Sequence, residues 1–198
     1  MNNLTDTNEI TFSQIQEMNI FRFHLAKSKR EAYTINELFR DSKSFSDFKR
    51  KLYDLYSDID IDKLGDEYSY AVNARTLCID YDRMIKKTKL FPYWKINLIK
   101  DREYPEEAYL LDNLVLPATS EFWKSIFPPN FLGDTSYVTS LMDFEGNQID
   151  QILMNDRVQR FLNSDFWKTC SENGFGINRA VKSLVLEENE KYLRSLDD

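Results

Sequence analysis

The feature that most restricts the fold is a long stripe of apolar and small residues between positions 61 and 88. Its members recur every three or four residues, the spacing of one face of an α-helix: Leu64, Tyr68, Ala71, Ala74, Cys78, Tyr81 and Ile85. The stripe predicts one continuous helix, roughly 40 Å long at 1.5 Å per residue. A helix of that length crosses most of a domain of this size, and the small residues in its middle allow another element to approach closely.

Three earlier segments have the same spacing and are expected to be helices: residues 11–30, 34–39 and 44–56. Ser44 and Asp47 stand at the positions of an acidic variant of the capping box, which marks the start of the third segment. Residues 1–10 are polar and are expected to be loose. The first half of the chain is therefore expected to be helical.

The period changes to two after position 90. Residues 91–100 alternate, with Trp94, Ile96 and Leu98 on one side, and predict a strand, while residues 113–117 predict a second, shorter one. Glycine is scarce, 5 residues in 198, so few tight turns are available for a many-stranded barrel. Residues 143–149 predict a turn between two short extended pieces. Residues 155–171 predict a short helix, and residues 177–196 predict a C-terminal helix.

Together these patterns predict an α+β fold that is predominantly helical. The expected organisation has three parts: helices over 11–88 with the long helix last, a small β module over 91–138, and a mostly helical extension over 139–198 packed on the same domain.

Composition and charge restrict the function. The formal net charge is −7, and an acidic chain is repelled by phosphate backbones, which disfavours broad binding of nucleic acid. No apolar run approaches the ~20 residues that span a bilayer, and the first residues are polar and acidic rather than a signal peptide. Cys78 and Cys170 are few enough to suit a reduced compartment, although they could pair. We therefore expect a protein that is cytoplasmic at synthesis.

Few residues suggest catalysis or a cofactor. His24 is the sole histidine, so a Ser-His-Asp or Cys-His arrangement would have to use it; a surface or half-buried structural histidine is the simpler interpretation. "DIDID" at 58–62 resembles the start of a calcium loop, but Lys63 and Ser69 replace the required Gly and Glu. Acids at the start of the long helix explain this run through the helix dipole. We expect no catalytic residue, no metal and no cofactor.

Basic residues cluster at the end of the long helix, where cations suit the helix dipole. They are either a solvated helix end or a local contact to phosphate or to an acidic partner. The candidate partner contacts are Arg83, Lys86, Lys87 and Lys89.

The stretch "EFWKSIFPPNFLGD" at 121–134 is rigid and aromatic. Ser120 is expected to cap a helical turn that stops at the first proline, and the aromatic side chains are expected to cover the core of the β module. We interpret the stretch as a structural elbow whose members are Phe122, Trp123, Phe127, Pro128, Pro129 and Asn130.

Three segments resemble the Mu F-like phage head morphogenesis family, the minor head proteins of tailed phages: "LGDEYSYAVNARTLCIDYDRM", "LFPYWKINLIKDREYPEEAYLLDNLVLP" and "EFWKSIFPPNFLGD". They are similar to the family's long helix, to its strand and Leu-Asp-Gly turn, and to its Phe-Trp-x-x-x-x-Pro-Pro-Asn-Gly pattern. The resemblance covers residues 35–138. It implies a structural role in head assembly or DNA delivery through the portal or capsid.

The chain departs from the family pattern at its ligand-like positions. Ala108 stands where the family has a histidine, and Asp134, Thr135 and Ser136 stand where it has Cys-x-Cys. One His and two Cys would suit zinc, and Asp134 alone would not hold it tightly. Asn113 replaces the glycine of the turn and can still adopt a left-handed conformation.

Three functions are compatible with these patterns. The first is a phage or prophage minor head protein that binds portal or capsid proteins, made in the bacterial cytoplasm and placed in the virion head. The second is a binding or immunity-type regulatory module of a mobile element, outside the virion. The third is a nuclease, which the residues support least.

Overall fold

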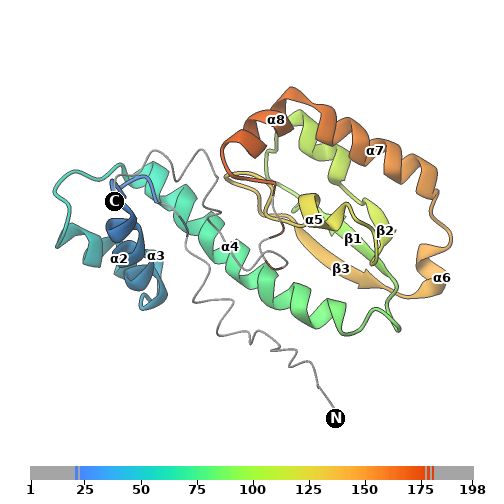
Figure 1. Ribbon diagram of the computed structural model, residues 1–198, viewed down its shortest axis with the longest axis horizontal. Helices are drawn as coiled ribbons and strands as arrows, with labels where there is room; N and C mark the ends of the chain where they lie inside the picture. The colour runs from blue at the N-terminus through green and yellow to red at the C-terminus, as the bar shows by residue number, and fades with distance from the viewer. Residues whose placement is uncertain (1–20, 22, 177, 179, 181–198) are drawn as a thin grey trace, which may run out of the picture.

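The computed structural model describes residues 21, 23–176, 178 and 180. It is an α+β structure in which helices predominate, as the sequence predicted (Figure 1). The helices are α2 (Lys29–Arg40), α3 (Phe45–Tyr53), α4 (Ile61–Ile85), the 3₁₀ helix η1 (Glu106–Leu111), α5 (Trp123–Ile126), α6 (Asp143–Gly146), α7 (Gln151–Asn163) and α8 (Asp165–Glu172). The strands are β1 (Tyr93–Asn97), β2 (Val115–Pro117) and β3 (Tyr137–Leu141).

The strands form one antiparallel sheet in the order β2-β1-β3. Trp94 lies opposite Leu116 on β2 and Ser140 on β3. Because side chains alternate along a strand, these residues share one face of the sheet with Ile96 and Val138. Trp94 and Ile96 are fully buried while their neighbours on β1 are half-buried, as the predicted alternation requires.

Helix α4 contributes to two separate hydrophobic cores. Leu64 and Ala71, near its start, pack into a core built with α2 and α3, whereas Leu77 and Met84, near its end, pack into a core built on the sheet. Figure 1 shows α2 and α3 at one end of α4 and the sheet at the other, with α7 and α8 on the side of the sheet away from α4. The long helix is therefore the element that both halves share.

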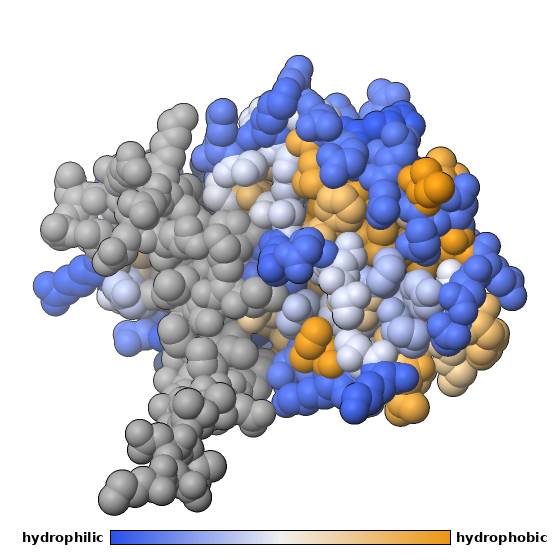
Figure 2. All heavy atoms as spheres, turned by 45° about the vertical axis from the view of Figure 1, so that its right-hand side comes forward, coloured by the Kyte–Doolittle hydropathy of each residue, from blue (hydrophilic) through white to orange (hydrophobic). Residues whose placement is uncertain are grey.

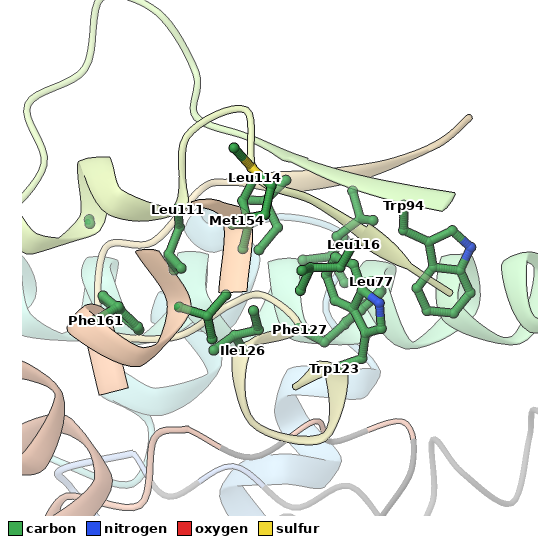
Figure 3. Close-up of a cluster of buried hydrophobic side chains, with 14 of the residues drawn as sticks. Leu77, Trp94, Leu111, Leu114, Leu116, Trp123, Ile126, Phe127, Met154 and Phe161 are labelled. Atoms are coloured by element: carbon green, nitrogen blue, oxygen red, sulfur yellow. The ribbon is translucent and has the colours of Figure 1, made fainter. Parts of the chain in front are cut away.

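The sheet core is largely aromatic at its centre. Figure 3 shows Trp94, Trp123 and Phe127 beside Leu77 of α4. The rings of Trp94 and Trp123 lie 5.4 Å apart between centroids, and Tyr81 of α4 makes edge contacts to Trp94 at 5.5 Å and to Phe127 at 4.9 Å. Such aromatic pairs add to the burial of their surface. They hold the last turns of α4 on the sheet.

The helix predicted over 11–30 is wrong over residues 23–28, and only its last two residues lie in a helix. Residues 23–27 form a turn and irregular backbone, and Phe23 is fully buried in the first core. The helix begins instead at Lys29, because the Ser28 hydroxyl accepts a hydrogen bond from the Glu31 N–H at 3.2 Å. The segment predicted over 34–39 is the second half of this helix, α2. Residues 1–20 lie outside the described residues.

The Ser44 cap of α3 is confirmed, with its hydroxyl 3.2 Å from the Asp47 N–H. The Asp47 carboxylate accepts from the Lys43 N–H rather than from that of Ser44, so the reciprocal half of the capping box is shifted by one residue. Asn113 has φ 53°, the left-handed conformation expected at this turn.

The predicted stripe of α4 is correct at its centre and wrong at its end. Ala71, Ala74 and Cys78 are buried, but Ile85 is 41% exposed and its neighbour Met84 is buried instead. Leu64 is also buried, and so are three residues besides Met84 that lie outside the stripe: Glu67, Tyr70 and Leu77. The helix is buried over a wider arc than one stripe because two cores lie against it.

Three predictions for the chain after position 119 need correction. The extended piece before position 143 is β3, but residues 143–146 form the helical turn α6 and a helix follows them. The helix predicted over 155–171 is two helices, because the Ser164 hydroxyl caps α8 by accepting from the Trp167 N–H at 3.1 Å. Ser120 is not the N-cap of α5, which begins at Trp123. The boundary expected at 138 falls inside β3, and the helix predicted over 177–196 lies outside the described residues except for positions 178 and 180.

Trp123→Ala is expected to lower the free energy of unfolding by about 3–5 kcal/mol, the range for large buried aromatic residues. Trp123 is 2% exposed, and its indole N–H donates to the Pro117 carbonyl at 2.9 Å, so the substitution also removes one of the two donors to that oxygen. Urea unfolding monitored by circular dichroism measures the change. Leu90→Ala is the matched control, since Leu90 is 71% exposed and should cost no more than about 0.5 kcal/mol. Equal losses from the two variants would contradict a core position for Trp123.

Candidate functional site

The structural elbow is built into the sheet core. Trp123 and Phe127 are members of that core, Phe122 packs partly against it, and the Pro128–Pro129 peptide bond is cis. Both prolines and Asn130 are buried. The Tyr70 hydroxyl of α4 donates to the Pro129 carbonyl at 3.4 Å. The elbow therefore lies against the middle of α4.

A buried polar cluster follows the elbow. Asn130, Asp134 and Ser136 are each 2% exposed or less. The Asp134 carboxylate accepts from the Asn130 N–H at 2.6 Å and from the Ser136 N–H at 2.8 Å. Burial raises the pKa of Asp134, and these hydrogen bonds oppose that rise. Asn73 of α4 donates to the Asp134 carbonyl at 3.0 Å, which joins the loop to the helix.

Ala108, Asp134 and Ser136, the residues that the resemblance compares with metal ligands, do not fit a metal. Ala108 is fully buried and carries no donor atom. The two Asp134 oxygens already accept backbone hydrogen bonds, and Ser136 is a poor ligand beside the Cys it would replace. Within the described residues there is no group of three or more His, Cys, Asp or Glu side chains placed to hold an ion. Cys78 and Cys170 are buried and unbridged, and burial raises the pKa of Cys170 to about 11.

The four candidate contact residues lie where α4 ends. Arg83 is 3.5 Å from Asp80 and Lys86 is 2.9 Å from Asp82, both as exposed pairs within the helix, which contribute little stability. In the described part of the chain, neither Lys87 nor Lys89 makes an ion pair. This end of the helix thus presents cations that remain available to a ligand.

Two of these four residues enter a groove of about 420 Å³ between the end of α4 and strand β3. Its lining combines charged, polar and apolar side chains: Asp80, Arg83, Met84, Lys87, Phe91, Val138 and Ser140. Lys86 and Lys89 are not part of the lining. The structure therefore brings Arg83 and Lys87 together with a strand that lies far away in the sequence.

The hydrogen bonds of β1 determine which groups β3 directs into this groove. The Ile96 N–H donates to the Leu114 carbonyl at 2.9 Å, so Ile96 directs its backbone groups toward β2. The flanking residues Lys95 and Asn97 therefore bond to β3, opposite Thr139 and Tyr137. Because the direction alternates along a strand, Val138 and Ser140 point their N–H and C=O groups away from β1. These are the two β3 residues that line the groove.

The opposite edge of the sheet is closed. Pro117 of β2 has no N–H, and its carbonyl accepts from the Trp123 indole and from the Ser120 N–H, each at 2.9 Å. Val115, the other β2 residue that faces outward, is 2% exposed. The sheet thus has one blocked edge and one edge that borders a groove.

Sequence reasoning predicted an extended piece before residue 143 but did not assign it to this site, and it missed one buried acid. The stretch "YVTSL" at 137–141 is rich in residues that favour strands, which agrees with that extended piece. Glu67 was not predicted to be buried. Its carboxylate accepts from the His24 N–H and lies 2.9 Å from the His24 ring nitrogen Nδ1, while burial raises the pKa of Glu67. His24 is half-buried and ties the segment before α2 to α4.

Exposed hydrophobic side chains do not define a second site. The most exposed are Ile152 at 83%, Leu90 at 71% and Phe144 at 64%. On the face shown in Figure 2, hydrophobic residues lie in separate spots among hydrophilic ones. Scattered hydrophobic residues of this kind are ordinary on a protein surface.

Comparison with family models, with curated proteins and with solved structures finds no significant match. In the part of the chain that the structure describes, no helix is both long and apolar enough to cross a membrane.

The stability that depends on Asp134 is expected to fall as the pH rises. The pKa of Asp134 is raised from 3.8 in the folded chain, so its contribution is fully present below about pH 3.8 and is lost as the pH passes through the folded pKa. Asp134→Asn does not titrate at this position. The free energy of unfolding of the parent minus that of the variant should therefore decrease from acidic to neutral pH in urea titrations. A difference that grows with pH would contradict the raised pKa.

Chelation is expected to leave the melting temperature unchanged. The loop after the elbow is held by the hydrogen bonds of Asp134 and by packing. A chelator therefore removes no interaction that stabilises the loop. Differential scanning calorimetry before and after dialysis against EDTA checks this, with zinc added back as the control. A drop in melting temperature that zinc reverses would overturn it.

Proposed function

We propose that the chain is a phage or prophage minor head protein with a structural role, which docks onto a portal or capsid protein. The phage assignment is supported by the resemblance over residues 35–138. The docking role is supported by one observation above all: a cationic helix end lines the same groove as a strand edge that pairs with no other strand among the described residues.

The chemistry of the groove suits a protein partner better than nucleic acid. Met84, Phe91 and Val138 contribute apolar surface, and Asp80 places an acid beside Arg83. A phosphate backbone would be attracted by the cations but would leave the apolar side chains of the lining without a partner. We propose synthesis in the bacterial cytoplasm, a final location in the virion head, and no enzymatic activity.

A non-virion binding or immunity-type regulatory module is the second candidate. It is favoured because Ala108, Asp134 and Ser136 stand at the three positions where the resembled family has metal-ligand-like residues. Neighbouring genes discriminate between the candidates, because terminase and portal genes favour the head protein and a toxin gene favours the module. A nuclease is the weakest candidate, and assays on DNA and RNA with Mg²⁺ test it.

The head-protein proposal predicts that the chain co-purifies with virions. Density-purified particles and assembly intermediates from a host that carries the gene are probed with an antibody to this chain, and a pull-down with the tagged chain is analysed for portal and capsid proteins. We expect the chain in particles and a portal or capsid protein in the pull-down. Absence from both particles and intermediates would overturn the proposal, and a host with the gene deleted is the control.

A further inference from the structure

The strand edge of β3 defines the kind of partner that fits the groove. The N–H and C=O groups of Val138 and Ser140 point away from β1, and within the described residues none of them has a hydrogen-bond partner. A strand edge whose backbone groups lack a partner is a template for one more strand. An extended segment laid along it would bond through its backbone, which is the mode called β-augmentation.

The cations beside the β3 edge determine which kind of extended segment binds there. Lys87 has no ion pair among the described residues, and Arg83 is held only by an exposed pair with Asp80, so an incoming carboxylate can engage both cations. Alternate side chains of an added strand point to the same face. Acidic residues at every second position of the added strand would therefore point toward the end of α4. They would lie on the face of the sheet that carries the Val138 and Ser140 side chains.

We propose that the groove binds an extended, acidic segment of a partner protein, which adds to the sheet as a fourth strand beside β3. The inference rests on the proposed docking function and names the chemistry of its partner. A second copy of this chain is a poorer occupant, because β3 paired with β3 would bring two cationic helix ends to the same edge. Single-stranded DNA lacks the backbone N–H and C=O groups that the edge would pair.

The test uses the full chain and labelled synthetic peptides. The probe is a short peptide of alternating valine and glutamate, compared with the same peptide carrying lysine for glutamate and with a copy whose backbone is N-methylated at alternate residues. Fluorescence anisotropy measures binding, and NMR amide exchange reports on Val138 and Ser140. We expect the glutamate peptide alone to bind and to slow exchange at both amides. Equal binding of the N-methylated peptide, or no binding of the glutamate peptide, would overturn the inference.

A matched pair of proline variants tests the edge. Ser140→Pro removes an N–H that the ladder does not use, so the chain should fold and lose the peptide. Thr139→Pro removes an N–H bonded to β1 and should destabilise the fold, as the register requires. Unchanged peptide binding by folded Ser140→Pro would overturn the proposal. If Ser140→Pro fails to fold, the N-methylated peptide still decides the question.

A matched pair of charge reversals tests the helix end. Arg83→Glu with Lys87→Glu should weaken peptide binding about tenfold or more, whereas Lys49→Glu with Arg50→Glu on α3 makes the same change of net charge away from the groove and should not. Equal weakening by both pairs would overturn a specific site. A self-dimer that Ser140→Pro abolishes, or binding of a single-stranded DNA oligonucleotide in place of the peptide, would overturn the proposed occupant.

The outcomes separate this inference from the proposed function. Incorporation of the Ser140→Pro chain into virions at the parental level overturns the strand-docking inference and leaves the head-protein proposal intact. Absence of the parental chain from virions, with peptide binding that depends on Ser140, overturns the head-protein proposal alone.

Discussion

The structure depends on the contact between the last turns of α4 and the aromatic core of the sheet. Tyr81 makes edge contacts to both Trp94 and Phe127, and Leu77 packs into the same core. This contact places the end of a helix along a strand that lies more than fifty residues further on in the chain. Without it, the candidate groove would have no wall. The cations at the end of α4 matter for docking only because the aromatic residues hold that end against β3.

The elbow determines the exit path of the chain toward β3. Asn130 and Ser136 both donate backbone N–H groups to the carboxylate of one buried acid, Asp134, so the loop is closed by a single side chain. A buried carboxylate whose two oxygens each accept a backbone hydrogen bond ties the two ends of a loop together. These two hydrogen bonds fix the path of the loop from which β3 emerges.

Local patterns predicted the elements, and long-range packing decided the site. The two-residue period of residues 91–100 and the Ser44 cap are local signals; the cap is confirmed, and the strand is confirmed over a shorter range, Tyr93–Asn97. The burial of Met84 in place of Ile85, and of Glu67, depended on a second core that no local window contains. The four cations were predicted as a set because they are neighbours in the sequence. Of the four, only Arg83 and Lys87 line the groove, and they meet there Val138 and Ser140 from a distant segment.

An open strand edge is a hazard as well as a binding site, because it can pair with any extended chain. Lysine and arginine beside an edge are a usual protection, since they repel another copy of the same edge. Here that protection and the proposed recognition use the same side chains. Charges that keep two β3 strands apart would attract a strand that carries acids, so Arg83 and Lys87 can discourage self-association and select a partner at once. The blocked edge of β2, closed by Pro117 and the Trp123 indole, leaves β3 as the edge where this selection operates.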